Sequence, residues 1–410
     1  MAPDSWRERR VALELALLLA LALFLPLREA PKNLLWLAYV LVWFVGRARA
    51  RDFGGQLDRW DALLGAVLAS GYLAAVFGGV HRGDGNEYLA VNDIVRYGLL
   101  FNCVRRAGYT PAQKLQVLAM LVASSVVAEF EAIWNWKVAG TRRALELTSV
   151  GHVNHSAIYM TICAGIAAGL LAGMWRTLTL GMRAALCAAV LALMIGLFLG
   201  GSRAAGAIGV VLVFAAALVA ARTTGAGRMA WLATTLVVAL AALAGGTSAL
   251  YRQIEWGAQN YSLAQRDLIW NRGLAGWGEY PLFGLGMENY GHFKEETLKS
   301  WVAGQGRPYV AGEYAGAPHG HSLYVNTLVE RGLVGLSALL AFLSVWGMWL
   351  ARRLPRHADP PASVALWFAC GSAWLVTVLI GFANTTLHHE HAMLAMLALA
   401  LAVGPREPAA

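Results

Sequence analysis

Charged residues are scarce in this sequence, and their scarcity argues against a soluble protein. Only 14% of the 410 residues are Asp, Glu, Lys or Arg, 58% are hydrophobic, and the mean hydropathy is +0.53. A typical soluble chain has about 25% charged residues. The apolar runs are long, unbroken and rich in Leu and Ala, so they lack the alternation of a transmembrane β-barrel. The composition therefore predicts an all-α, polytopic membrane protein.

Cysteine is also rare, and acidic residues are outnumbered by basic ones. The cysteines show neither metal-type spacing nor a disulfide pattern, so we expect no redox chemistry and no cofactor. With 33 basic and 24 acidic residues the net charge is +9. Most arginines lie in short loops beside apolar runs, which indicates membrane topology and not a nucleic-acid partner. The four cysteines are Cys103, Cys163, Cys187 and Cys370.

About twelve apolar segments have the ~20-residue length that crosses a membrane, or are somewhat shorter. The first follows a basic segment, as in a signal peptide, but no small-residue cleavage site follows it, so we interpret it as an uncleaved first helix. The predicted spans are residues 11–27, 33–46, 60–80, 91–104, 114–134, 152–174, 180–200, 204–221, 229–247, 322–351, 362–384 and 389–404.

Loops rich in arginine alternate along the chain with less basic ones. The positive-inside rule assigns the arginine-rich set, for example residues 47–51 and 352–356, to the cytoplasmic face. Both termini are then cytoplasmic. The predicted organisation is nine spans over residues 1–247, a loop domain on the outer face over 248–320, and three spans over 321–410. The loop domain is rich in aromatic residues, which argues against disorder and suits a membrane interface or a sugar.

The polar segment re-enters the membrane at a stretch that combines histidines with a helix start. Polar residues recur there at a spacing of three to four residues, so they can line one face of a helix. They are His321, Ser322, Asn326 and Glu330. Ser322 or His321 can cap that helix. The unpaired N–H groups of a helix start favour anions, and an imidazole can exchange a proton near neutral pH. The alternative is a helix whose histidines merely lie among the lipid headgroups.

Two arginines on the outer face are candidates for binding phosphate. Arg203 opens a span between small residues, and arginine at membrane depth often marks an ion or substrate pathway. Arg266 heads a short amphipathic helix. Guanidinium groups bind phosphate oxygens in a bidentate manner. The alternatives are that Arg203 extends to the headgroups and that Arg266 pairs with Asp267 or Glu279.

Weaker candidates lie on the same face. Lys137, Arg142 and Arg143 are placed to meet the phosphates of an acidic lipid, or only ordinary headgroups. The run His388-His-Glu-His391 offers a zinc alternative, because His388 and His391 are spaced to share a helical side and can combine with His319 or His321. We expect no metal at the candidate site.

The ordered set of these motifs resembles the O-antigen ligase family, polytopic glycosyltransferases that share a ligase/polymerase domain. The matching residues are Gly201-Ser-Arg203, Arg266, Pro281-Leu-Phe-Gly-Leu-Gly286 and His321-Ser-Leu-Tyr-Val-Asn-Thr-Leu-Val-Glu-Arg-Gly332. By motif the resemblance covers about residues 180–350, and by topology the whole chain. His319 departs from the pattern, since a second histidine stands beside His321.

The resemblance implies an all-α protein with about 12 transmembrane helices and a large periplasmic segment between the ninth and tenth spans. It implies transfer of a polysaccharide from undecaprenyl pyrophosphate to lipid A-core at the periplasmic face of the inner membrane. In that reaction we expect His321 to deprotonate the acceptor hydroxyl, and Arg203 and Arg266 to bind the pyrophosphate in place of a metal ion. His319, Ser322 and Asn326 are possible supporting residues.

Two related activities and one different class compete with this prediction. An O-antigen polymerase or a protein O-oligosaccharyltransferase would use the same donor with another acceptor, and no residue identifies the acceptor. The predicted partners are therefore the lipid-linked glycan, lipid A-core and membrane lipids. A flippase would carry charged or broken helices at mid-membrane, whereas the polar residues here gather at one face.

Overall fold

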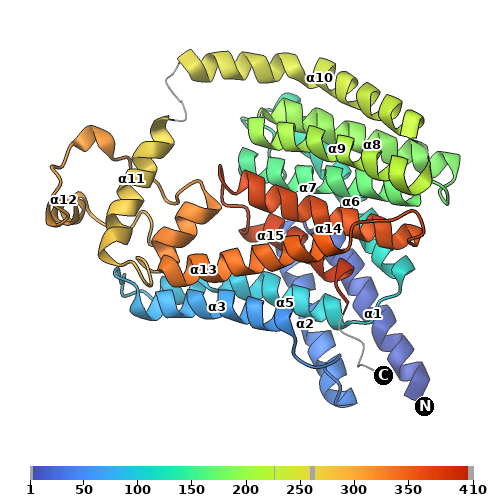
Figure 1. Ribbon diagram of the computed structural model, residues 1–410, viewed down its shortest axis with the longest axis horizontal. Helices are drawn as coiled ribbons and strands as arrows, with labels where there is room; N and C mark the ends of the chain where they lie inside the picture. The colour runs from blue at the N-terminus through green and yellow to red at the C-terminus, as the bar shows by residue number, and fades with distance from the viewer. Residues whose placement is uncertain (1–2, 226, 259–263, 405–410) are drawn as a thin grey trace.

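The computed structural model describes residues 3–225, 227–258 and 264–404, and within these ranges the protein is all-α, with no strand. Figure 1 shows long helices side by side, with two short helices, α11 and α12, at one end. The helices are α1 (Pro3–Phe24), α2 (Glu29–Ala50), α3 (Arg59–Phe77), α4 (Asn86–Ala90), α5 (Asn92–Arg106), α6 (Pro111–Lys137), α7 (Val153–Met174), α8 (Leu180–Gly200), α9 (Arg203–Thr224), α10 (Gly227–Ala258), α11 (Ala264–Glu279), α12 (Glu295–Gly304), α13 (Leu323–Arg352), α14 (Pro361–Ile380) and α15 (His389–Ala402), with a 3₁₀ turn η1 (Ala311–Glu313).

Each of the twelve predicted spans coincides with a helix, so the all-α, multi-pass prediction is confirmed. Among the residues that the structure describes, eight helices are long and apolar enough to cross a membrane: α3, α6, α7, α8, α9, α10, α13 and α14. Charged residues lower the hydropathy of α1 and α2, whereas α5 and α15 are shorter helices of 15 and 14 residues. The twelve-crossing topology therefore remains a prediction. α10 continues to Ala258, into the segment predicted as the loop domain.

Local sequence signals explain where several helices begin. Asp58 and Asp61 form a capping box at the start of α3, in which each side chain accepts a hydrogen bond from the other residue's backbone N–H. Thr110 and Gln113 do the same for α6, and Pro111 follows at the first helical position, where its missing N–H costs nothing.

The centre of the bundle is built from α7 and α15. Three glycines of α7, spaced four residues apart, face α14. A Cβ atom added at Gly173 would lie 2.6 Å from the backbone nitrogen of Ala365, and one at Gly165 would lie 2.5 Å from the side chain of Ser372. Small residues at this spacing let two membrane helices pack closely. α15 is enclosed on all sides, because its residues from Glu390 to Leu401 are all buried.

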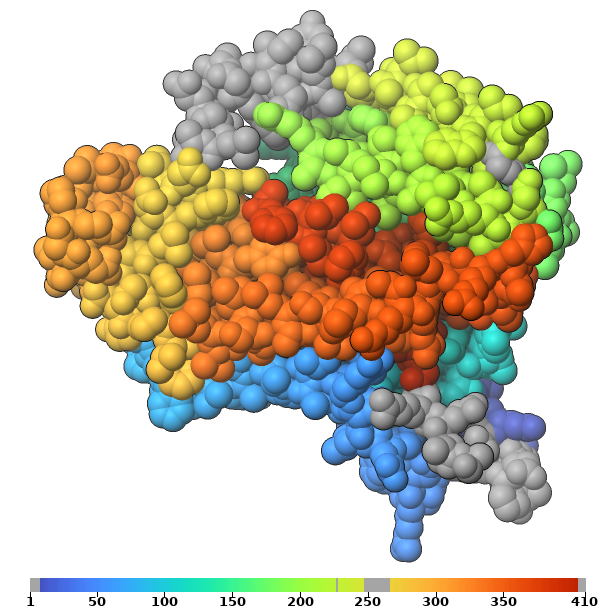
Figure 2. Space-filling model, in the orientation of Figure 1, coloured from blue at the N-terminus to red at the C-terminus, as the bar shows by residue number. Residues whose placement is uncertain are grey.

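The segment between α10 and α13 has a small hydrophobic core of its own. Buried aromatic side chains supply much of it, among them Tyr290, Phe293 and Trp301, with Leu285 and Val329. The ring centroids of Phe293 and Trp301 are 4.9 Å apart. These aromatic residues therefore stabilise the fold of the segment. In Figure 2, α12 and α11 form a lobe that projects beyond the end of α13.

α13 is broken at Gly332, where φ is 63° and ψ is −162°. The run 281–286 inserts at this break. Leu285 and Gly286 donate their N–H groups to the carbonyls of Val329 and Glu330, at 2.8 and 3.0 Å. On the other side of the break, residues 333 and 334 donate to the carbonyls of residues 281 and 282, at 2.8 and 3.2 Å. The inserted run thus satisfies the four backbone groups that the break would leave unpaired. The predicted turn is present, and it supports a broken membrane helix.

The polar groups of the bundle separate toward its two ends. At one end Arg105 forms ion pairs with Asp58 and Asp61, at 2.6 and 2.9 Å, and Arg106 pairs with Asp61 at 2.6 Å. In two other helices, Lys32 of α2 forms a buried ion pair with Glu390 in the first turn of α15. The side of the membrane on which each loop lies stays a prediction.

Candidate functional site

The segment that leads into α13 is held by hydrogen bonds on both sides. The indole N–H of Trp270 in α11 donates to the carbonyl of Gly320 at 2.7 Å, and the N–H of Gly320 donates to the Asn326 side chain at 2.9 Å. His321 has a φ of 45°, a left-handed conformation that is unfavourable for a residue with a side chain. The rings of His319 and His321 lie 4.2 Å apart. Strain of this kind clusters at functional sites.

The first turn of α13 has the cap that its sequence predicts. Ser322 is the N-cap and accepts a hydrogen bond from the N–H of Val325 at 3.4 Å. Its hydroxyl also donates to the carbonyl of Gly381, at the end of α14, at 3.2 Å. Asn326 donates to Glu330 at 3.0 Å, so these two residues share one helix face, as their spacing predicts. His321 therefore lies immediately before a well-anchored helix start.

The charge of Arg266 acts on His321. Burial, together with the charges of His319, Arg266 and His152, lowers the pKa of His321 to about 4. Burial and His152 also lower the pKa of His319. Both imidazoles are therefore neutral at pH 7, which is the form that accepts a proton. Arg266 lies in the first turn of α11, and its side chain is half-buried.

Arg203 shares no described contact with Arg266 or the two histidines. It is the first residue of α9, and its side chain is exposed. Among the described residues, no contact joins Arg203 to Arg266 or His321. Nor does Arg266 form the ion pair with Asp267 or Glu279 that the sequence leaves open, within the part of the chain described here. Glu279 instead accepts a hydrogen bond from Gln305 at 3.0 Å.

The three basic residues at the end of α6 and in the loop after it are exposed. Lys137 lies over the ring of Trp136, with its Nζ 3.6 Å from the ring centroid, and Arg142 forms an ion pair with Glu146 at 3.3 Å. Arg143 is exposed beside them. Within the described ranges, no contact brings any of the three to His321.

Histidines from three separate segments gather at this end of the bundle. The ring of His155 lies 5.8 Å from that of His152, 6.1 Å from that of His388 and 5.0 Å from that of His391. His152 in turn acts electrostatically on His319 and His321. The sequence shows three pairs of nearby histidines, His152/His155, His319/His321 and His388/His391. Only the tertiary structure brings these pairs together into one group.

A polar cavity of about 260 Å³ opens within this group. The buried pair Glu330 and Arg331 lies at its wall. Arg331 donates to Thr327 at 3.1 Å, and its Nη1 atom is buried without a hydrogen-bond partner in the part of the chain that the structure describes. Sequence analysis did not single out Arg331, although an arginine beside a glycine in an apolar run was a signal for it. The polar and charged residues lining the cavity are Asp93, Tyr97, His155, Glu288, His292, His319, Asn326, Thr327, Glu330, Arg331, Thr385 and His388.

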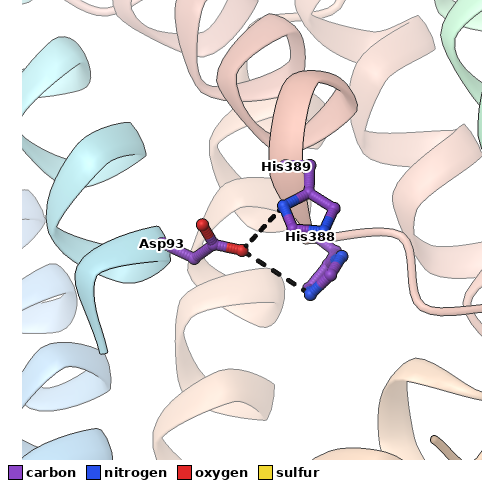
Figure 3. A group of neighbouring side chains, drawn as sticks. All are labelled: Asp93, His388 and His389. Atoms are coloured by element: carbon purple, nitrogen blue, oxygen red, sulfur yellow. Dashed lines mark ion pairs between the residues drawn. The ribbon is translucent and has the colours of Figure 1, made fainter. Parts of the chain in front are cut away.

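Asp93 is a further residue that the sequence did not assign. In Figure 3 its carboxylate points from α5 toward two histidines at the start of α15. One carboxylate oxygen, Oδ2, lies 3.1 Å from Nδ1 of His389 and 3.5 Å from Nε2 of His388. The zinc alternative from the sequence paired His388 with His391. His388 is the extended residue just before α15, and Nε2 of His391 contacts the carbonyl of Thr385 at 2.9 Å, so that pairing stays a prediction.

One protein family matches the part of the chain that carries most of these residues. The O-antigen ligase family model matches residues 187–340, from within α8 to within α13, a range that contains Arg203, Arg266 and His321. The match spans less than half of the chain, and over that range the chain is similar to the O-antigen ligase family. No curated protein matches the chain. This similarity supports glycosyl transfer of the general ligase or polymerase type, and the apolar helices indicate a multi-pass membrane protein.

Proposed function

We propose that this protein is an O-antigen ligase. It transfers a polysaccharide from undecaprenyl pyrophosphate to lipid A-core at the periplasmic face of the bacterial inner membrane, in lipopolysaccharide biosynthesis. The observation that carries the proposal is the placement of His321, a neutral imidazole at a helix start, within the electrostatic reach of Arg266. In this topology twelve spans place both termini in the cytoplasm, and α11, α12 and the histidine group in the periplasm.

The reaction needs a base and a site for negative charge. The acceptor hydroxyl attacks the anomeric carbon, and its proton passes to His321. The bond between the anomeric carbon and the pyrophosphate oxygen breaks, and undecaprenyl pyrophosphate leaves with the electron pair. A single displacement of this kind inverts the anomeric carbon. Guanidinium groups of Arg266 and Arg203 bind the departing pyrophosphate in place of a metal ion.

Binding of the donor also changes the pKa of His321. A pKa of about 4 makes His321 a weak proton acceptor in the empty site. The negative charge of a bound pyrophosphate stabilises the imidazolium and raises this pKa. His321 therefore becomes more basic only once the donor is in place. The ring of His319 lies beside that of His321 and supports it. Ser322 anchors the start of α13 through its hydrogen bond to Gly381. Asn326 orients the backbone before His321, because its side chain accepts a hydrogen bond from the N–H of Gly320.

The acceptor is bound on the same face. Lys137 at the end of α6, with Arg142 and Arg143 in the loop after it, are exposed cations, and phosphorylated lipid A-core is an anionic lipid. We propose that they meet its phosphate groups. Truncating each of them should raise the KM for lipid A-core and leave kcat nearly unchanged, because the contacts are remote from the reacting atoms.

The test is transfer in vitro with purified protein, undecaprenyl-pyrophosphate glycan and lipid A-core, with EDTA present. Wild type should form glycan-bearing lipid A, and His321→Ala should lose roughly 10²–10⁴-fold in rate. His81→Ala, at an exposed histidine outside the site, is the matched control and should keep full activity. Near-normal transfer by folded His321→Ala would refute the assignment of the base. Longer glycans made from donor alone, with none on lipid A, would show that the protein is a polymerase.

A further inference from the structure

Asp93, His388 and His389 place three metal-ligating side chains around one point. One donor atom from each lies within 4.8 Å of the other two. The ligands come from α5 and from the start of α15, segments far apart in the sequence that only the fold brings together. Figure 3 shows both imidazoles directed at the same carboxylate oxygen.

The spacing of the donor atoms matches a small divalent ion. The distances from Oδ2 of Asp93 are 3.1 Å to His389 and 3.5 Å to His388. In a tetrahedral zinc site with bonds of ~2.0–2.1 Å, neighbouring ligand atoms are roughly 3.3 Å apart. A neutral imidazole and a carboxylate are also the ligand types that zinc prefers.

The surroundings hold these ligands in place. The other carboxylate oxygen of Asp93, Oδ1, faces Arg96 at 3.9 Å, a contact that orients the carboxylate. His389 has a left-handed φ of 46°, and next to it Glu390 is tied to Lys32 by a buried ion pair. The strained backbone at His389 is thus held where its ring reaches Asp93, as at many binding sites.

A fourth coordination position is open. The side chains of Asp93, His388 and His389 are 24%, 37% and 45% exposed. Asp93 and His388 line the polar cavity, so water can reach a metal bound between them. Three protein ligands with an open position is the arrangement of accessible zinc sites, in contrast to the four protein ligands of structural ones.

We propose that Asp93, His388 and His389 bind one Zn²⁺ ion, with water in the fourth position, and that the ion clamps α15 to α5. The site takes divalent ions that prefer nitrogen, and we assign it no step in glycosyl transfer. The competing arrangement is a plain ion pair between Asp93 and a protonated His389, which would bind no metal.

The experiment uses the full-length protein in detergent, stripped with chelator, with Co²⁺ as a spectroscopic probe. Wild type should bind one Co²⁺ per chain with the intense visible bands of four-coordinate cobalt, and Zn²⁺ should displace it. Asp93→Asn and His388→Ala should each weaken binding by more than the ~10–100-fold that loss of an orienting partner alone costs. His81→Ala should bind as wild type does.

Two results would overturn the proposal. One is a wild-type protein that binds no cobalt or gives only the weak spectrum of the hydrated ion. The other is equal affinity in wild type and both ligand variants, which would place the metal elsewhere. The readout is binding and not transfer, so the outcome is independent of the ligase assignment. Because the wild-type spectrum decides the first result, a variant that fails to fold does not prevent the test.

Discussion

The break in α13 gives a prediction whose size follows from the backbone. Gly332 has φ 63° and ψ −162°, a region open essentially only to glycine, and a side chain forced into such a region costs about 1–3 kcal/mol. A Cβ atom would also strike the backbone of Leu282, which belongs to the inserted run. If two of the four hydrogen bonds across the break are lost, about 1 kcal/mol each is added. Gly332→Ala should therefore destabilise the protein by roughly 3–5 kcal/mol.

Thermal unfolding in detergent measures this change. At about 2 °C per kcal/mol for a large domain, the variant should melt roughly 6–10 °C below wild type. Gly65→Ala, in the middle of α3 with no atom within 4 Å of the added Cβ, is the control and should be neutral or stabilising by up to ~1 kcal/mol. If Gly332→Ala and Gly65→Ala melt at the same temperature, the inserted run does not depend on Gly332 and our account of the break is wrong.

Three further predictions concern charge and capping. Arg266→Gln removes a cation that lowers the pKa of His321, so the acid limb of the kcat/KM pH profile, expected near pH 4 for wild type, should move to higher pH. An acid limb that stays in place would show that Arg266 does not act on the pKa of His321. Lys32→Met leaves Glu390 buried and unpaired, and should cost about 3–5 kcal/mol in thermal unfolding, with Lys32→Met/Glu390→Met recovering most of it. Ser322→Ala removes the cap of α13 and should cost about 1 kcal/mol in the same assay, and no loss would show that the cap is dispensable.

The proposed base also has a consequence for stability. Burial holds His321 neutral in the folded protein, with a pKa below the ordinary value of 6.5. The unfolded chain therefore binds a proton first as the pH falls, and folding loses stability between pH 6.5 and about 4 from this group alone. His319, whose pKa is lowered in the same way, adds to that loss. His321→Gln should reduce the acid sensitivity of unfolding relative to wild type.

The positions of the helices follow from the sequence, because the membrane leaves few alternatives. A run of about 20 apolar residues must satisfy its own backbone hydrogen bonds in lipid, and a helix does so locally. Each predicted span accordingly coincides with a helix. The cap at Ser322 and the shared face of Asn326 and Glu330 were also predictable, since both depend on residues within one or two helical turns.

The tertiary structure alone determined how distant segments meet. Nothing local indicates that Leu285 and Gly286 pair with carbonyls in α13, or that Asp93 reaches His388 and His389. The sequence marked the inserted run only as a turn. It suggested an interface or a sugar for aromatic residues such as Trp301 that instead form a core. Spacing along one helix is set by its own geometry, whereas contacts between helices depend on the packing of the whole bundle.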